Sequence, residues 1–180
     1  MKASLFEGST ISAAGFAIFA TLLLCACVAD VQHRRIPNRV AGLLAATGMA
    51  YSAVASARPG HALTVSLGGL LLGLTLWLPL YAVRWLGAGD VKLFAAAGAW
   101  LGPARTVEGA LVGALAGGVL AVVWMLVAYG VSGTAATAAL AIANPRKIVN
   151  RGLDVKSRRA IPYGVALAIG AMTAALLPLP

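Results

Sequence analysis

The stretch "LGAGDVKLFAAAGAWLG", residues 86–102, decides the fold class and raises the main question about function. A glycine-rich tripeptide leads directly into Asp90, and an almost unbroken apolar run follows. Such a run is typical of a helix buried in a protein core or a bilayer. Placing an aspartate near the centre of a bilayer costs about 2.5–3.5 kcal/mol on insertion scales. Asp90 therefore needs a structural or a functional explanation.

The composition around this stretch indicates a polytopic membrane protein. Of the 180 residues, 61% are hydrophobic and 11% are charged, and the mean hydropathy is +0.90, which is too apolar for an ordinary soluble domain of this length. The net charge of +9 could suggest nucleic acid as a partner. The basic residues, however, lie in short gaps between apolar runs, as in membrane topology signals, so we expect no nucleic-acid partner.

Apolar runs separated by Arg, Pro and Gly predict an all-α fold with about six transmembrane helices. The runs cover residues 11–29, 39–57, 62–83, 91–102, 107–131 and 161–179. The fourth run is short, because Gly102-Pro103 ends it after about 12 residues, or about 18 Å of helix against a hydrocarbon core of about 30 Å. This segment is tilted, shielded by neighbouring helices, or continued past the proline.

The basic residues predict the orientation. If the first loop is cytoplasmic, eleven of the 14 Lys and Arg residues fall on the inner side, so both termini are expected to be extracytoplasmic. The basic stretch at about 132–160 is then a cytoplasmic loop held near anionic lipid headgroups. Its alanine-rich front either extends the fifth helix or lies in the interface. No boundary divides the chain, so we expect one domain over residues 1–180.

Two carboxylates are expected at the same depth, because Asp30 ends the first apolar segment and Asp90 opens the fourth. Asp90 alone could be a helix N-cap. Asp30 stands near a helix C-terminus, where the macrodipole disfavours negative charge, so a structural role explains it poorly. A functional pair is the better interpretation, with the carboxyl groups within about 10 Å of each other.

Two close carboxylates can share one proton, since like charges a few ångströms apart do not both ionise easily. One can accept a proton from water while the other donates to a carbonyl oxygen, which is direct hydrolysis of an amide. Gly87 and Gly89 have no Cβ and would let a substrate backbone approach Asp90. We expect no metal and no cofactor, and we interpret Cys25 and Cys27 as small apolar residues.

The segment "DVQHRRIPN", residues 30–38, adds a helix boundary. Pro37 fixes φ and favours extended backbone at Ile36, so the first helix should end before it and Asn38 should cap the second. His33 is interpreted as a solvated loop residue.

Together these motifs resemble those of the prepilin peptidases, the membrane aspartic proteases that remove the leader of type IV pilin-like precursors. "GAGDVKLFAAAGAWLG" resembles their G-x-G-D signature, and "DVQHRRIPN" is similar to the segment with their first catalytic aspartate. "IPYGVALAIG", residues 161–170, looks like a further signature that opens the last helix. The three motifs follow the family's order between residues 30 and 170.

The resemblance implies a GxGD aspartic protease architecture in the bacterial inner membrane, with Asp30 and Asp90 as the catalytic pair and cleavage at the cytoplasmic face. The expected partners are a pilin-like precursor and membrane lipid, with pilus assembly machinery as a further possible partner. Lys92 could equally be a snorkelling residue at the interface. The residues expected to bind substrate or support the site are Gly87, Gly89, Lys92, Pro37, Asn38, Ile161, Pro162, Tyr163 and Gly164.

One departure narrows the assignment. Larger family members carry paired C-x-x-C motifs and also methylate the new pilin amino terminus, and this sequence lacks those cysteines. It looks like the short, peptidase-only branch, similar to the tight-adherence (Flp) pilus enzymes, with no methyltransferase or zinc-binding domain. Two other interpretations stay open: an ion or proton transporter that uses the same aspartates, and a non-catalytic subunit of a pilus or secretion assembly.

Overall fold

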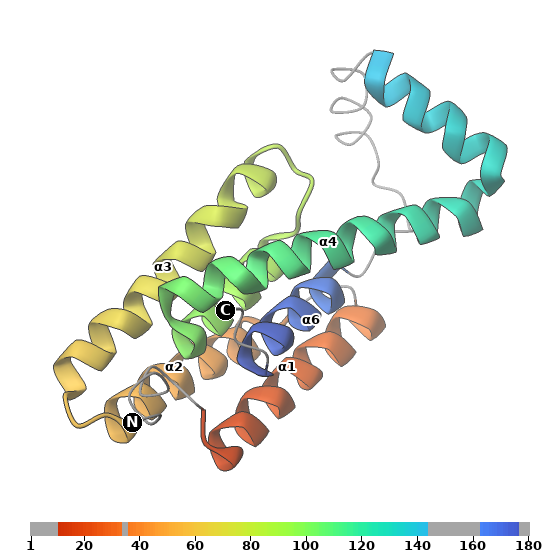
Figure 1. Ribbon diagram of the computed structural model, residues 1–180. Coiled ribbons are helices and arrows are strands. Elements are labelled where there is room, and N and C mark those ends of the chain that lie inside the picture. Colours follow the sequence, from red (N-terminus) through yellow and green to blue (C-terminus); the bar gives the residue numbers. More distant parts are fainter. Residues whose placement is uncertain (1–10, 34–35, 144–162, 177–180) are drawn as a thin grey trace, which may run out of the picture.

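The computed structural model describes residues 11–33, 36–143 and 163–176, and within these ranges the chain forms a helical bundle without strands (Figure 1). This confirms the predicted all-α fold class. The first helix ends before Pro37, as expected. The helices are α1 (Ala13–His33), α2 (Asn38–Ala55), α3 (Pro59–Ala82), α4 (Ala88–Ala143) and α6 (Tyr163–Leu176).

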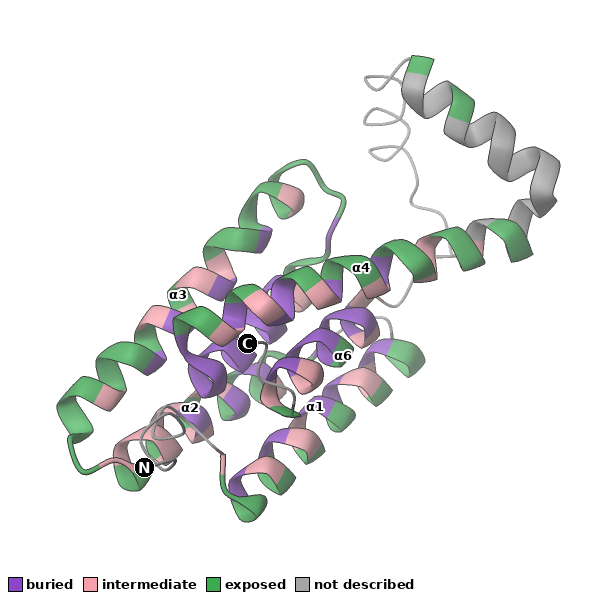
Figure 2. Cartoon of the chain, viewed as in Figure 1, coloured by how far each residue is buried: buried purple, intermediate pink, exposed green. Residues whose placement is uncertain are grey.

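The outer surface of the bundle is apolar. Large side chains such as Leu24, Leu71 and Leu115 are more than half exposed, and Figure 2 shows exposed residues along the outer faces of α1 and α3. Three described segments are long and apolar enough to cross a membrane: Ala13–His33, Pro59–Ala82 and Ala88–Trp124. These features are those of a membrane protein, whose outer faces contact lipid rather than water.

The fourth and fifth predicted segments form one element, α4, so the fourth segment continues past the proline, one of the expected alternatives. Gly102 has a left-handed φ of 72°, and Pro103 follows it without a connecting loop. We call residues 88–102 the first arm of α4 and residues 103–124 the second arm. The alanine-rich stretch before residue 144 is helical and extends α4, whereas the basic part of the expected loop lies outside the described residues.

The two arms run in opposite directions along α3. Toward the C-terminal end of α3, the contacts move backward along the first arm: Gly69 faces Gly98 and Gly102, and Gly73 faces Phe94 and Ala95. The first arm is therefore antiparallel to α3.

The second arm runs parallel to α3. Gly68 faces Pro103, and Leu76 and Trp77 face residues 107–111. The chain therefore reverses at Gly102, within an element that stays helical on both sides (Figure 1).

The first arm lies inside the bundle. Val91 and residues 93–102 are all buried, so shielding by neighbouring helices explains how a short segment can lie at membrane depth. Buried polar contacts hold it in register: Ser66 Oγ donates to the Ala99 carbonyl at 2.7 Å, and Trp100 Nε1 donates to the Leu44 carbonyl at 2.8 Å.

The recurring glycines of the third and fifth predicted segments are close-contact faces, as expected. A Cβ at Gly69 would collide with the Gly98 carbonyl of the first arm. On the second arm, Gly109 and Gly113 lie against α6, and a Cβ at Gly117 would meet the ring of Tyr163. These contacts bring the start of α6 to the end of the bundle where α4 begins.

Candidate active site

Three helix ends that are far apart in the sequence bring Asp30 and Asp90 together. Asp30 lies in the last turn of α1 and Asp90 in the first turn of α4. A Cβ built on Gly164, at the start of α6, would lie 2.8 Å from Asp30 Oδ2 and 3.2 Å from Asp90 Oδ1. Since both oxygens are this close to one point, they are at most about 6 Å apart. The proximity agrees with the expectation, while the catalytic role stays a prediction.

Asp90 is positioned by the start of its own helix. Because α4 begins at Ala88, Asp90 is the third helical residue and not the N-cap, which corrects one of the interpretations above. Its Oδ2 accepts a hydrogen bond from the Gly87 N–H at 3.2 Å. An acidic side chain that reaches back to the N-cap N–H is one half of a capping box. This contact occupies one carboxylate oxygen, and the other faces Gly164.

Asp30 is stabilised by a helix that is remote in the sequence. The side chain is only 8% exposed, and its Oδ2 accepts a hydrogen bond from the Gly164 N–H at 3.2 Å. The first N–H groups of a helix have no partner within the helix, and they carry its positive end charge. The start of α6 therefore offsets the unfavourable position of Asp30 at the C-terminal end of α1.

Gly164 was expected to support the site, and the geometry gives it a specific part. Its missing side chain leaves the space between the two carboxylates, and its N–H orients one of them. A Cβ there would also lie 3.2 Å from Ile36 Cδ1. The sequence signal was the glycine at the opening of the last apolar run, but the pattern alone does not indicate what it contacts.

Ile36 lies beside Gly89, whose expected role of giving a substrate access to Asp90 stays a prediction. A Cβ on Gly89 would meet Ile36, at 3.2 Å from its Cβ and 3.4 Å from its backbone nitrogen, rather than open space for a substrate. Ile36 is buried and was not among the predicted site residues. Pro37 has φ −61° and ψ 133°, and a proline restricts the residue before it, here Ile36, to extended backbone. Ile36 thus packs between the first turns of α4 and α6.

The remaining predicted site residues lie at the rim or outside the described ranges. Lys92 Nζ donates to Asn38 Oδ1 at 3.2 Å, and both side chains are exposed. Pro37 is the N-cap position of α2 and no side chain caps this helix, so the expected capping by Asn38 is wrong. Tyr163 is half-buried. Two predicted residues, Ile161 and Pro162, lie outside the described residues.

Metal-ligating groups are sparse near the site. In the part of the chain that the structure describes, no three His, Cys, Asp or Glu side chains are placed to hold a metal ion. Cys25 is exposed and Cys27 is half-buried on α1.

Comparison with known proteins shows where this arrangement belongs. A family model described as the type IV leader peptidase family matches residues 17–126, more than half of the chain. The chain belongs to the type IV leader peptidase family. A leader peptide-processing enzyme for type 4 prepilin-like proteins from Escherichia coli O78:H11 (strain H10407 / ETEC) is 32% identical over 116 residues. No solved structure matches the chain.

The family match covers both aspartates, while α6 and Gly164 lie beyond it. The similarity to the Escherichia coli enzyme covers 59% of this chain and 41% of that protein, so the chain spans less than half the length of the relative. The family match therefore says nothing about the hydrogen bond between Gly164 and Asp30, which is seen only in the structure.

Proposed function

We propose that this protein is a membrane aspartic endopeptidase that removes the leader peptide from type IV or Flp pilin-like precursors. The observation that carries the proposal is the pair of carboxylate oxygens at most about 6 Å apart, contributed by the ends of α1 and α4. Membership of the type IV leader peptidase family supports it, as does the printed function of the relative.

The proposed reaction is direct attack of water on the scissile amide. A water between the carboxylates gives its proton to the ionised aspartate while its oxygen bonds to the carbonyl carbon. The protonated aspartate donates to the carbonyl oxygen, and the C–N bond then breaks with proton transfer to the leaving nitrogen. The two carboxylates supply both the base and the acid, so the step uses no metal ion or organic cofactor.

Backbone hydrogen bonds support this reaction by fixing the two side chains. Among the described contacts, each aspartate accepts one N–H at its Oδ2, from Gly87 or from Gly164. Fixed reacting groups lower the barrier, because misplacement by about 1 Å can cost a hundredfold in rate.

We place the reaction at the cytoplasmic face of the bacterial inner membrane. Asp30 directly precedes the basic first loop, and the excess of Lys and Arg favours the cytoplasm for that loop. On this orientation both termini are extracytoplasmic and the basic stretch at about 132–160 is cytoplasmic. Lipid and pilus assembly proteins remain the other proposed partners.

The test is cleavage of a purified pilin-like precursor by the purified protein in lipid vesicles. Asp30→Asn and Asp90→Asn should each reduce the cleavage rate at least a hundredfold, since general acid–base catalysis contributes about 10²–10⁴-fold. Cys25→Ser and Cys27→Ser serve as matched controls on α1 and should cleave normally.

Correct insertion and an unchanged melting temperature must accompany the loss in the Asn variants. Cleavage near the wild-type rate in either Asn variant would refute the dyad. Normal cleavage by the Asn variants, combined with loss of an ion or proton flux that the wild-type protein shows, would instead favour a transporter.

A further inference from the structure

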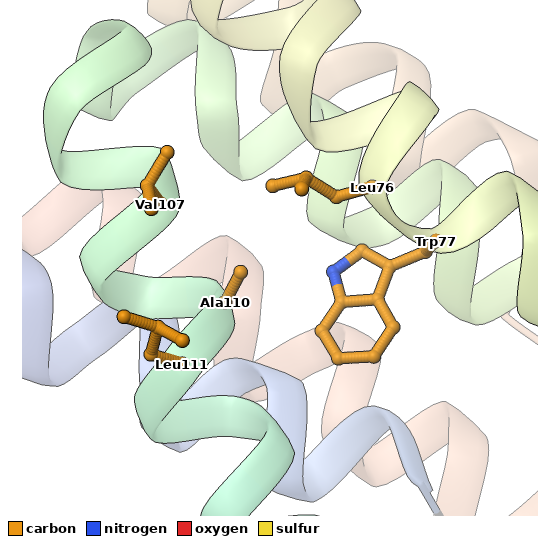
Figure 3. A pocket seen from close by; sticks show the side chains of 5 residues that line it. All are labelled: Leu76, Trp77, Val107, Ala110 and Leu111. Carbon is orange, nitrogen blue, oxygen red and sulfur yellow. The ribbon is translucent and has the colours of Figure 1, made fainter.

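A small cavity lies between α3 and the second arm of α4, apart from the carboxylates. Its volume is about 140 Å³, and its walls are Leu76, Trp77, Val107, Ala110 and Leu111 (Figure 3). Leu111 is 61% exposed, and Val107 and Leu76 are about two-fifths exposed. The cavity therefore opens on the apolar outer surface of the bundle, on the side that contacts the membrane.

Trp77 places an unused hydrogen-bond donor at this cavity. The residue is only 5% exposed, yet its Nε1 has no hydrogen-bond partner among the described residues. Figure 3 shows the indole nitrogen on the side of the ring that faces the cavity. Trp100, the other buried tryptophan in the core, donates its Nε1–H to the Leu44 carbonyl. A buried donor without a partner is costly, so an acceptor that enters the cavity is favoured.

The cavity is close to the proposed reaction. The Trp77 ring packs edge-on against Phe94, with centroids 5.7 Å apart, and Phe94 is one helical turn after Asp90. The same ring packs against Tyr163 at 6.3 Å, and Tyr163 directly precedes Gly164. Ring contacts thus connect a wall of the cavity to residues that neighbour the carboxylates in the chain, and an extended substrate covers about 3.3 Å per residue.

We propose that this cavity is a substrate subsite that binds an apolar side chain of the precursor's membrane-embedded segment near the scissile bond. In this arrangement the Trp77 Nε1–H donates to a backbone carbonyl of the precursor. The inference rests on the proposed function. A peptide must leave its helix to be cleaved, and its freed carbonyls then need donors, because a bilayer supplies none. A lipid acyl chain would fill the cavity but has no acceptor for the indole.

The first test removes the donor and keeps an aromatic ring. Trp77→Phe should lower kcat/KM for a full-length precursor about fivefold to tenfold, mainly by raising KM. The melting temperature should stay the same or rise, because the change removes an unpaired buried N–H. A tryptophan that only fills the core would give the opposite result, a lowered melting temperature with normal kinetics.

The second test narrows the mouth of the cavity at an exposed position. Leu111→Trp should lower kcat/KM at least tenfold for the full-length precursor. It should have no effect on a soluble peptide that contains the cleavage site but lacks the apolar segment. Leu115→Trp is the matched control, since Leu115 is 72% exposed and lies one turn further along the same arm. This control should cleave both substrates normally.

The inference is overturned if Trp77→Phe keeps the wild-type kcat/KM, or if Leu111→Trp and Leu115→Trp behave alike. An equal loss on the soluble peptide would also overturn it, because a lipid or folding effect would then explain the data. A failure of the proposed function is distinguishable, since the wild-type protein would then not cleave at all. In that case, the subsite is tested by binding. The affinity of the Asp90→Asn protein for labelled precursor is measured with and without Trp77→Phe, which should weaken it about fivefold.

Discussion

At Gly164 a hydrogen atom lies where any other residue would place a Cβ atom between two carboxylates. Gly164→Ala should reduce the cleavage rate at least a hundredfold, because its Cβ would lie 2.8 Å from Asp30 Oδ2 and 3.2 Å from Asp90 Oδ1, where the attacking water belongs. The measurement is turnover per folded molecule, with the melting temperature recorded on the same preparation.

Gly89→Ala is the control for this prediction, with the same methyl one position before Asp90. Its Cβ would meet Ile36 at 3.2 Å, so it should lower stability by about 1–3 kcal/mol through overpacking and reduce turnover less than tenfold. A larger loss of turnover at Gly89 than at Gly164 would contradict the geometry.

The sequence was sufficient to predict the two aspartates and their proximity, because Asp30 ends one apolar segment, Asp90 opens another, and both were expected on the same side of the membrane. It was not sufficient for the contact that holds Asp30, since the Gly164 N–H comes from 134 residues further along the chain. The role of Ile36 was missed for a similar reason. Local rules describe the extended backbone before Pro37, but they do not indicate which glycine that side chain will meet.

At the scale of the element, the reversal in α4 depends on one backbone conformation. Gly102→Ala should lower the melting temperature, because a left-handed φ of 72° costs an L-residue about 1–2 kcal/mol. The new Cβ would also lie 3.1 Å from Val65 Cγ1.

Gly118→Ala on the same helix is the matched control. Apart from the adjoining backbone of its own helix, no atom of the described residues lies within 4 Å of the position that the added methyl would take, and alanine is favoured over glycine in a helix interior by about 0.5–1 kcal/mol. Thermal unfolding of the two variants should therefore shift in opposite directions. Equal shifts would show that Gly102 does not need its left-handed conformation.

Hydropathy predicted the change of direction at Gly102-Pro103 but not its form. A glycine after one helix and a proline at the first position of the next are the usual end and start signals, and continuation of the segment past the proline was one of three alternatives. Here the signals adjoin, and Thr106 Oγ1 donates to the Gly102 carbonyl at 2.7 Å, as threonine hydroxyls often do to the carbonyl four residues before. A sequence pattern does not show how many residues will separate two consecutive helices.

For the whole molecule, the placement of the site at the cytoplasmic face is testable by labelling. In a Cys25→Ser, Cys27→Ser background, a membrane-impermeant thiol reagent added to intact cells should label Ala57→Cys, which is exposed between α2 and α3. It should label Arg39→Cys, exposed at the start of α2, only after the membrane is opened. The reverse pattern would place the carboxylates outside.

The burial of the first arm also constrains how the chain enters the membrane during synthesis. The apolar residues 93–102, preceded by Asp90 and Lys92, are a weak signal for lateral release from a translocation channel. Their burial partners include Gly69 and Gly73 on α3, made earlier, and the second arm, made later. The tight reversal at Gly102 lets both arms leave the channel as one hairpin. We therefore expect Asp90 to reach its final depth only after the ribosome has completed the second arm.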